Sequence, residues 1–437
     1  MNHDPDGTDS GQLSPFSRSY TRYALGLLLV VYIFNFIDRQ IVSILLQTIK
    51  EDLGLSDTQL GFFSGTSFAI FYSTLGIPIA RYSDRSVRRN LIAVALFAWS
   101  AMTAIQGLAR SFTMLAAARI GVGIGEAGCS PPAHSMISDL FPAERRGTAL
   151  SIYALGIPIG SAIGLAAGGW IADNLSWRVA FFVVGLPGLL LAAVVRLTLR
   201  EPPRGGYDAA PAPGVSQEPL REVASFLLRR RSFLHIAFGG SLHAFIGYGA
   251  GAFNPAFFER VHGFTLTELG AILATVSLTA GVAGTFLGGF LGDRFARRDL
   301  RWYAWLPALA TLLTIPFFFP FYLEPSAWGA VAWSVVPALL SGMYLGPTFA
   351  ITQSMVPPRW RAQASSVLLL VLNLIGLGLG PQFVGWLSDL LEPRYGIESL
   401  RYALLWTVSL GALWSAFHYF VGARDLREDL RAHEALG

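Results

Sequence analysis

The sequence predicts an all-α polytopic membrane protein: twelve transmembrane helices in two pseudo-symmetric six-helix bundles, with both termini in the cytoplasm. Three observations support this fold class: an apolar composition, twelve apolar segments of spanning length, and motifs that recur in two halves. Of the 437 residues, 53% are hydrophobic and 14% are charged, and the mean hydropathy is +0.49. Such a chain is too apolar for a soluble globular protein.

About twenty apolar residues are needed to cross a hydrocarbon core of about 30 Å. The segments that meet this length are 22–47, 59–82, 90–109, 113–139, 147–171, 178–199, 232–257, 266–291, 302–323, 327–353, 362–388 and 400–422. The polar first twenty residues lack the apolar core of a signal peptide, so we expect the first span to insert uncleaved.

Basic residues between the spans set the orientation. With residues at the ends of spans counted with the adjoining loop or tail, the two tails and the loops after the even-numbered spans hold 24 of the 32 lysine and arginine residues. The alternate loops hold six, and the interiors of the spans hold two. Because cytoplasmic loops are enriched in these residues, both termini are predicted to be cytoplasmic in a multi-pass protein of the cell (inner) membrane. Loop charge also explains the pI of about 9.3 without a nucleic-acid partner.

The chain is expected to divide into five parts. These are a cytoplasmic N-terminal tail (1–20), an N-terminal six-helix bundle (21–199), a cytoplasmic linker (200–231), a C-terminal six-helix bundle (232–422) and a cytoplasmic C-terminal tail (423–437). The linker begins rich in proline and glycine, which is typical of a flexible segment. Leu220, Val223 and Leu227 then follow at helical spacing, which predicts a short amphipathic helix on the membrane surface.

Two motifs occur once in each half. The string A-R-Y-S-D-R-S-V-R-R at 80–89 matches G-F-L-G-D-R-F-A-R-R at 289–298, and G-W-I-A-D at 169–173 matches G-W-L-S-D at 385–389. The similar spacings indicate two related six-span halves. Parallel repeats about an axis along the membrane normal, with the substrate site at mid-depth between them, are a transporter architecture.

Four charged residues lie deep within predicted spans. Asp38 and Arg39 occur in N-F-I-D-R-Q of the first span, and Arg119 and Glu126 in A-A-R-I-G-V-G-I-G-E-A-G of the fourth. Charge at bilayer depth costs several kcal/mol, on the order of 3 or more, so such residues face a protected interior and have partners. Seven residues of helical rise, about 10.5 Å, separate Arg119 from Glu126. We therefore expect Arg119 to pair with Asp38 or with an anionic substrate.

These charges suggest a coupling mechanism. Desolvation favours the neutral form of a carboxyl group and a neighbouring arginine favours the ionised form, so a substrate that takes the arginine away makes the acid bind a proton. We hypothesise that Asp38 and Glu126 carry the proton and that Arg119 and Arg39 hold a phosphate or carboxylate. The alternative is a fixed charge cluster that only joins spans one and four.

The repeated G-x-x-x-D-R-x-x-R-R string resembles the signature of the major facilitator superfamily, although Ala80 and Val87 depart from it in the first copy. Within that superfamily, N-F-I-D-R, R-I-G-V-G-I-G-E-A, D-L-F-P-A-E-R-R, I-P-I-G-S-A-I-G and L-R-E-P-P-R-G resemble the Spinster family. That resemblance implies export of phosphorylated sphingoid bases and lysophospholipids, in some members with proton coupling. It also implies a cytoplasmic gate, and the matching residues are Asp84, Arg85, Arg88, Arg89, Asp293 and Arg294.

The predicted function is therefore secondary active, proton-coupled transport of an amphipathic anionic lipid by alternating access. The spans of the second half carry no ionised residue at mid-depth, which suits an acyl tail. The alternative is a proton-coupled carrier of a small organic anion. The absence of H-E-x-x-H, nucleophile-elbow and G-x-x-x-x-G-K-[ST] motifs argues against an enzyme or an ATP-driven pump. We expect no metal or cofactor, and a monomer whose partners are the lipid substrate, protons and the bilayer.

Overall fold

The computed structural model describes residues 16–83, 85–205 and 220–434, and within these ranges all regular structure is helical. The helices form twelve stretches in the predicted order, six in each half. By length and composition, eight segments of the described chain could cross a membrane, the last of which covers the final two predicted spans. The predicted spans at 90–109, 113–139 and 232–257 are helical as well. The predicted fold class is confirmed.

The N-terminal bundle contains six stretches, several of them interrupted. They are α1 (Arg18–Leu53); α2 (Asp57–Gly61) with η1 (Phe62–Thr66) and α3 (Ser67–Ser83); α4 (Arg88–Gln106); α5 (Phe112–Glu126) with α6 (Ser130–Leu140); α7 (Ala143–Ala154) with α8 (Gly156–Asn174); and α9 (Trp177–Thr198). Glycines allow close packing inside this bundle. A Cβ added at Gly160 of α8 would lie 2.4 Å from the carbonyl oxygen of Ile33 in α1.

The C-terminal bundle repeats this plan. After the short helix α10 (Leu220–Leu228) come α11 (Arg231–His262); α12 (Leu266–Val276) with η2 (Ser277–Gly281) and α13 (Val282–Ala296); α14 (Trp302–Leu323); α15 (Ala327–Ser341) with α16 (Leu345–Ser354); η3 (Pro358–Trp360), α17 (Arg361–Leu372), η4 (Asn373–Leu377) and α18 (Gly378–Tyr395); and η5 (Gly396–Glu398) with α19 (Ser399–Glu434). The last helix continues into the predicted C-terminal tail as far as Glu434.

Corresponding helices of the two halves begin in the same way. Ser56 caps α2 and Gln59 returns a hydrogen bond to the cap, while Thr265 and Glu268 do the same for α12. Such capping boxes satisfy two backbone N–H groups that have no partner inside the helix. The repeat therefore extends from the sequence motifs to the local structure of the helix ends.

The helix α10 is present as predicted, and part of its apolar face packs on protein. Val223 and Leu227 are fully buried, and the ring of Phe226 packs against Trp360 at a centroid distance of 5.5 Å. The physical reason is that α17 offers an apolar surface next to the linker, so the helix packs on protein. The beginning of the linker is also held in place, because Arg204 donates hydrogen bonds to the carbonyl groups of Ser83 and Ser86.

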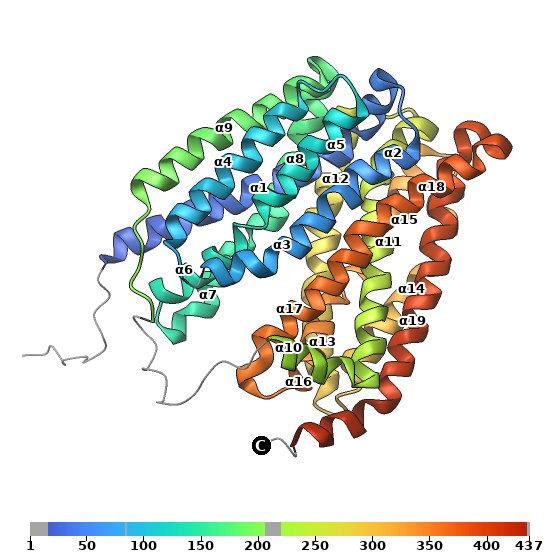
Figure 1. Ribbon diagram of the computed structural model, residues 1–437. Helices are drawn as coiled ribbons and strands as arrows, with labels where there is room; N and C mark the ends of the chain where they lie inside the picture. Colours follow the sequence, from blue (N-terminus) through green and yellow to red (C-terminus); the bar gives the residue numbers. More distant parts are fainter. Residues whose placement is uncertain (1–15, 84, 206–219, 435–437) are drawn as a thin grey trace, which may run out of the picture.

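Figure 1 shows the two bundles leaning together at one end and separating toward the end where α19 finishes. At the first end, called the closed end here, α2 packs on α18 and α8 packs on α12. The opposite end, called the terminal end, carries α6 and α7 on one side and α10, α16 and α17 on the other. The ribbons of the two bundles are thus farther apart at the terminal end than at the closed end.

Candidate functional site

Arg119 and Asp38 form the ion pair that the sequence predicts between the fourth and first spans. Arg119 Nη1 lies 2.8 Å from Asp38 Oδ2, and both side chains are at most 3% exposed. The hydroxyl group of Thr103 on α4 donates to the other carboxylate oxygen of Asp38 or to the carbonyl oxygen of Trp99, since both lie within hydrogen-bonding distance. Asp38 is therefore enclosed by three helices of the N-terminal bundle.

A second ion pair joins Arg39 to Glu126, and spacing along the chain did not predict this pairing. Arg39 Nε lies 2.8 Å from Glu126 Oε2. The Arg39 guanidinium also lies over the rings of Tyr72 and Phe68, 4.5 and 4.9 Å from their centroids. These aromatic faces provide cation–π contacts for a charge that is partly removed from water.

The same Phe68 ring lies close to both arginines, because Arg119 is 4.8 Å from its centroid. Two buried polar atoms of the cluster lack a hydrogen-bond partner among the described residues: Arg119 Nε and Glu126 Oε1. A buried donor or acceptor without a partner carries an unmet hydrogen-bonding capacity. The cluster can therefore accept a further polar group.

A cavity of about 320 Å³ lies between the two bundles beside this cluster. Its wall includes polar, aromatic and small side chains from both halves: Phe36, Arg39, Gln40, Val42, Ser43, Ser64, Phe68, Arg119, His243, Ala244, Gly247, Tyr248, Gly251, Ala252, Ser341, Tyr344, Leu377 and Pro381. Both arginines reach the cavity. A cation at the wall of an apolar cavity suits the binding of an anionic group.

Asp38 and Glu126, the two acids of the cluster, are not among the residues that line this cavity. Their exposed fractions are 0% and 1%. The acids lie behind the arginines because an arginine side chain is long enough to bind a carboxylate and still reach the cavity. An anion in the cavity thus meets the guanidinium groups first.

The C-terminal wall of the cavity contains a polar residue that sequence reasoning missed. His243 on α11 is 2% exposed; its Nδ1 lies 2.9 Å from the Thr311 hydroxyl, and its Nε2 lies 3.1 Å from the Ser341 carbonyl oxygen. Ser341 ends α15, so the ring supports the break between α15 and α16. The histidine also stacks on Tyr344 at 4.1 Å.

The residues expected to form the cytoplasmic gate are dispersed in this structure. Arg88 is fully buried and binds Asp139, Glu201 and Ser135, and the backbone N–H of Arg89 donates to Glu201 at 2.9 Å. These partners all belong to the N-terminal half or to the start of the linker.

The second copy of the gate motif also stays within its own half. Asp293 accepts a hydrogen bond from Tyr303 at 2.9 Å, and Arg85 and Arg294 are exposed. Asp84 lies outside the described residues. The described gate residues therefore make these hydrogen bonds and ion pairs within their own half.

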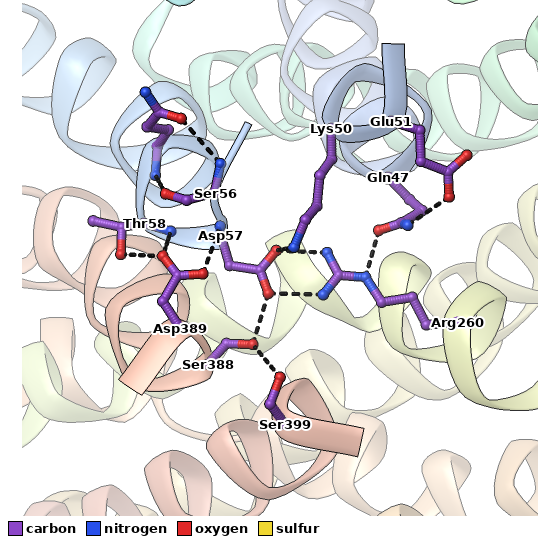
Figure 2. A network of polar contacts seen from close by, with 11 residues as sticks. Gln47, Lys50, Glu51, Ser56, Asp57, Thr58, Arg260, Ser388, Asp389 and Ser399 are labelled. Carbon is purple, nitrogen blue, oxygen red and sulfur yellow. Dashed lines mark hydrogen bonds and ion pairs between the residues drawn. The ribbon is translucent and has the colours of Figure 1, made fainter. Parts of the chain in front are cut away.

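At the closed end, Asp57 is the centre of an ion-pair network between the halves (Figure 2). Its carboxylate lies 2.6 Å from Arg260 of α11 and 2.7 Å from Lys50 of α1, and it accepts a hydrogen bond from Ser388 of α18 at 2.6 Å. The sequence indicated only loop charge at Arg260 and Lys50. Their partner could not be found from spacing along the chain.

The family model described as Major Facilitator Superfamily matches residues 28–381. This chain belongs to the major facilitator superfamily. Among its curated relatives, an MFS-type efflux pump of Mycolicibacterium smegmatis is 34% identical over 407 residues, covering 93% of this chain and 94% of the relative. Protein spinster homolog 3 of Danio rerio is 27% identical over 463 residues, covering 99% and 91%.

The solved structures agree with this membership. A bacterial homologue of the human lysosomal transporter Spinster, crystallised in an inward-facing and unoccupied conformation, superposes with a TM-score of 0.89. It is 33% identical in sequence, and the match covers 95% of this chain and 99% of that one. This major facilitator protein is accordingly a membrane transporter of the Spinster type and not an enzyme.

Proposed function

We propose that this transporter moves an amphipathic anionic lipid, either a lysophospholipid or a phosphorylated sphingoid base, and that this movement is coupled to protons. The main support is one arrangement: Arg39 and Arg119 reach the cavity between the bundles while their acidic partners lie behind them. The headgroup phosphate binds the arginines, and the acyl chain lies along the aromatic wall that includes Tyr248 and Tyr344.

Proton coupling follows from competition for the arginines. When a phosphate draws Arg119 toward the cavity, Asp38 loses its ion-pair partner in a site from which water is excluded. Desolvation then favours the neutral acid, so Asp38 binds a proton. The same exchange applies to Arg39 and Glu126. Release of the lipid returns each arginine to its acid and expels the proton.

Alternating access completes the proposal. The halves are held together at the closed end, so substrate enters the cavity from the terminal end, which the loop charges predict to be cytoplasmic. In the opposite state, the gate residues Asp84, Arg85, Arg88, Arg89, Asp293 and Arg294 close the terminal end. The protein then works as a monomer in the cell (inner) membrane.

One observation favours the alternative of a small organic anion. The cavity measures about 320 Å³, which lies at the small end of the range of about 300–1,000 Å³ typical of ligand pockets. A lipid tail would have to extend beyond this volume along the space between the bundles. A carboxylate of a few carbons would fit inside it.

The two substrate classes can be compared by measuring uptake into proteoliposomes. The compounds are lysophosphatidic acid as the anionic lipid, lysophosphatidylcholine as a lipid without net charge, and gluconate as the small organic anion. We expect transport of the anionic lysolipid, with loss of most of this activity in Arg119→Ala. Arg110→Ala is the matched control, because Arg110 is an exposed arginine outside the cavity wall. Movement of gluconate alone would establish the alternative. Failure of both anions would contradict both proposals.

A further inference from the structure

The repeated G-W-x-x-D motif has a structural role that its sequence did not reveal. Asp173, the aspartate of the first copy, lies in the last turn of α8 in the N-terminal bundle. Its carboxylate accepts hydrogen bonds from the backbone N–H groups of Leu266 at 3.2 Å and Thr267 at 2.6 Å, and from the Thr267 hydroxyl at 2.6 Å. Asp173 therefore caps the first turn of α12, a helix of the opposite bundle.

The second copy makes the same contacts in the reverse direction. Asp389 of α18, in the C-terminal bundle, accepts hydrogen bonds from the backbone N–H groups of Asp57 at 2.9 Å and Thr58 at 2.7 Å, and from the Thr58 hydroxyl. Figure 2 shows this carboxylate beneath the first turn of α2. Each half thus supplies one acid to cap a helix of the other.

The glycine of each motif allows this contact. A Cβ added at Gly169 would lie 2.1 Å from the carbonyl oxygen of Leu266, and one added at Gly385 would lie 2.0 Å from that of Asp57. The nearest atoms to both added groups belong to the opposite bundle. These glycines are therefore required for contact between the bundles.

A second pair of glycines follows the same symmetry on the capped helices. Added Cβ atoms at Gly61 and Gly270 would each lie 2.4 Å from a carbonyl oxygen across the interface, that of Pro381 and that of Leu165 respectively. The segments S-D-T-Q-L-G at 56–61 and T-L-T-E-L-G at 265–270 correspond residue by residue. The contacts at the closed end therefore come in two copies related by the internal repeat.

We propose that these two contacts are paired clasps that set the balance between the open and closed forms of this end during transport. The first clasp is Asp173 and Gly169 with Leu266 and Thr267, and the second is Asp389 and Gly385 with Asp57 and Thr58. Each cap exists only while the bundles touch. When the end opens, water hydrates both the carboxylate and the helix N–H groups. This inference does not depend on which substrate is carried.

The two clasps differ in strength. In the second, Asp57 also pairs with Arg260 and Lys50, whereas Leu266 at the equivalent position of the first clasp is apolar. Loss of the Asp389 cap leaves the ion pairs in place. Loss of the Asp173 cap removes its three hydrogen bonds from Leu266 and Thr267 of α12. Loss of Asp173 is therefore expected to shift the balance toward the open form of this end more than loss of Asp389 does.

Distances between spin labels on the full-length protein in liposomes test whether the clasps hold the closed end together. Cys129 is the single cysteine of the sequence and is 1% exposed, so labels can be placed at Leu108 and Ile397 in a Cys129→Ser background. These residues are 56% and 68% exposed and follow α4 and α18. We expect Asp173→Ala to raise the ratio of long to short distances about fivefold, the effect typical of one helix cap. Asp389→Ala should raise it less.

The controls separate clasp loss from general damage. Glu392→Ala removes an exposed acid from the same helix as Asp389 and should leave the distances unchanged. Gly169→Ala and Gly385→Ala should open the closed end through steric clash, whereas Gly26→Ala, with no atom within 4 Å of the added group, should not. Unchanged distances in the aspartate variants would overturn the proposal, whether or not the glycine variants shift.

Discussion

Arg119 binds Asp38 at 2.8 Å on one side and lines the central cavity on the other. Its partner is 0% exposed, so the guanidinium group separates the acid from any occupant of the cavity. A substrate anion and a buried carboxylate thus compete for one cation. This competition is the physical basis of the predictions on transport that follow.

The Arg119 and Asp38 pair should affect stability and transport differently. Arg119→Leu leaves a buried acid without its partner, which costs about 3–5 kcal/mol. In Arg119→Leu/Asp38→Leu, most of this stability should return because the whole pair is replaced by apolar groups, while transport stays lost. Thermal unfolding in detergent and vesicle uptake measure the two effects. A double variant as unstable as the single one would contradict this account.

Glu126→Gln should weaken the coupling of transport to the pH gradient. The amide can still accept a hydrogen bond from Arg39, so the geometry of the pair is kept, but it cannot exchange a proton. We expect substrate exchange to continue in proteoliposomes while stimulation by a pH gradient becomes weaker, because only Asp38 can still exchange a proton. The matched control is Glu392→Gln, at an exposed glutamate of α18. Gradient stimulation equal to that of the unmodified protein would exclude proton carriage by Glu126.

Thr103→Val should move the pH profile of transport upward. The hydroxyl group of Thr103 lies within hydrogen-bonding distance of Asp38 and of the Trp99 carbonyl oxygen. A donor to a carboxylate stabilises its ionised form, so a role of this hydroxyl in coupling predicts a less stable ionised form in the valine variant. Proton uptake then occurs at higher pH. Thr103→Ser keeps the donor and should retain the original profile. The measurement is the transport rate across a series of symmetric pH values, and identical profiles for the Val and Ser variants would refute the role of the hydroxyl group.

Arg88 and Arg85 belong to one motif but should differ greatly in their effect on folding. Arg88 is fully buried between Asp139 and Glu201, so Arg88→Ala leaves two acids without their partner and should cost about 3–5 kcal/mol. Arg85 is exposed, and Arg85→Ala should change stability by less than about 0.5 kcal/mol. Thermal unfolding in detergent compares the stability that each of the two variants loses. Equal losses would show that the motif folds as a unit.

Much of the fold followed from local patterns. Apolar length located the spans, because each transmembrane helix satisfies its backbone hydrogen bonds within its own segment. The repeated motifs predicted two halves, and the corresponding capping boxes of α2 and α12 agree with this. The amphipathic pattern of α10 showed that a face would be buried, but it could not show that Val223 and Leu227 on that face pack on protein.

The site was predicted in part. Charge within apolar spans identified Asp38, Arg39, Arg119 and Glu126, and helical rise excluded the easy pairing of Arg119 with Glu126. The pattern could not reveal that Arg39 binds Glu126, or that both acids lie behind the arginines. His243 was missed because a single histidine in an apolar segment gives no signal of its own.

Taken alone, the sequence determined the properties that belong to one segment at a time: which stretches cross the membrane, which way they face, and which crossings carry charge. Only the tertiary structure decided which charges meet. Arg39 and Glu126 are 87 residues apart, and Asp389 caps a helix 332 residues away. Such contacts depend on how whole helices pack, and no spacing along the chain encodes the distance between two helices in space.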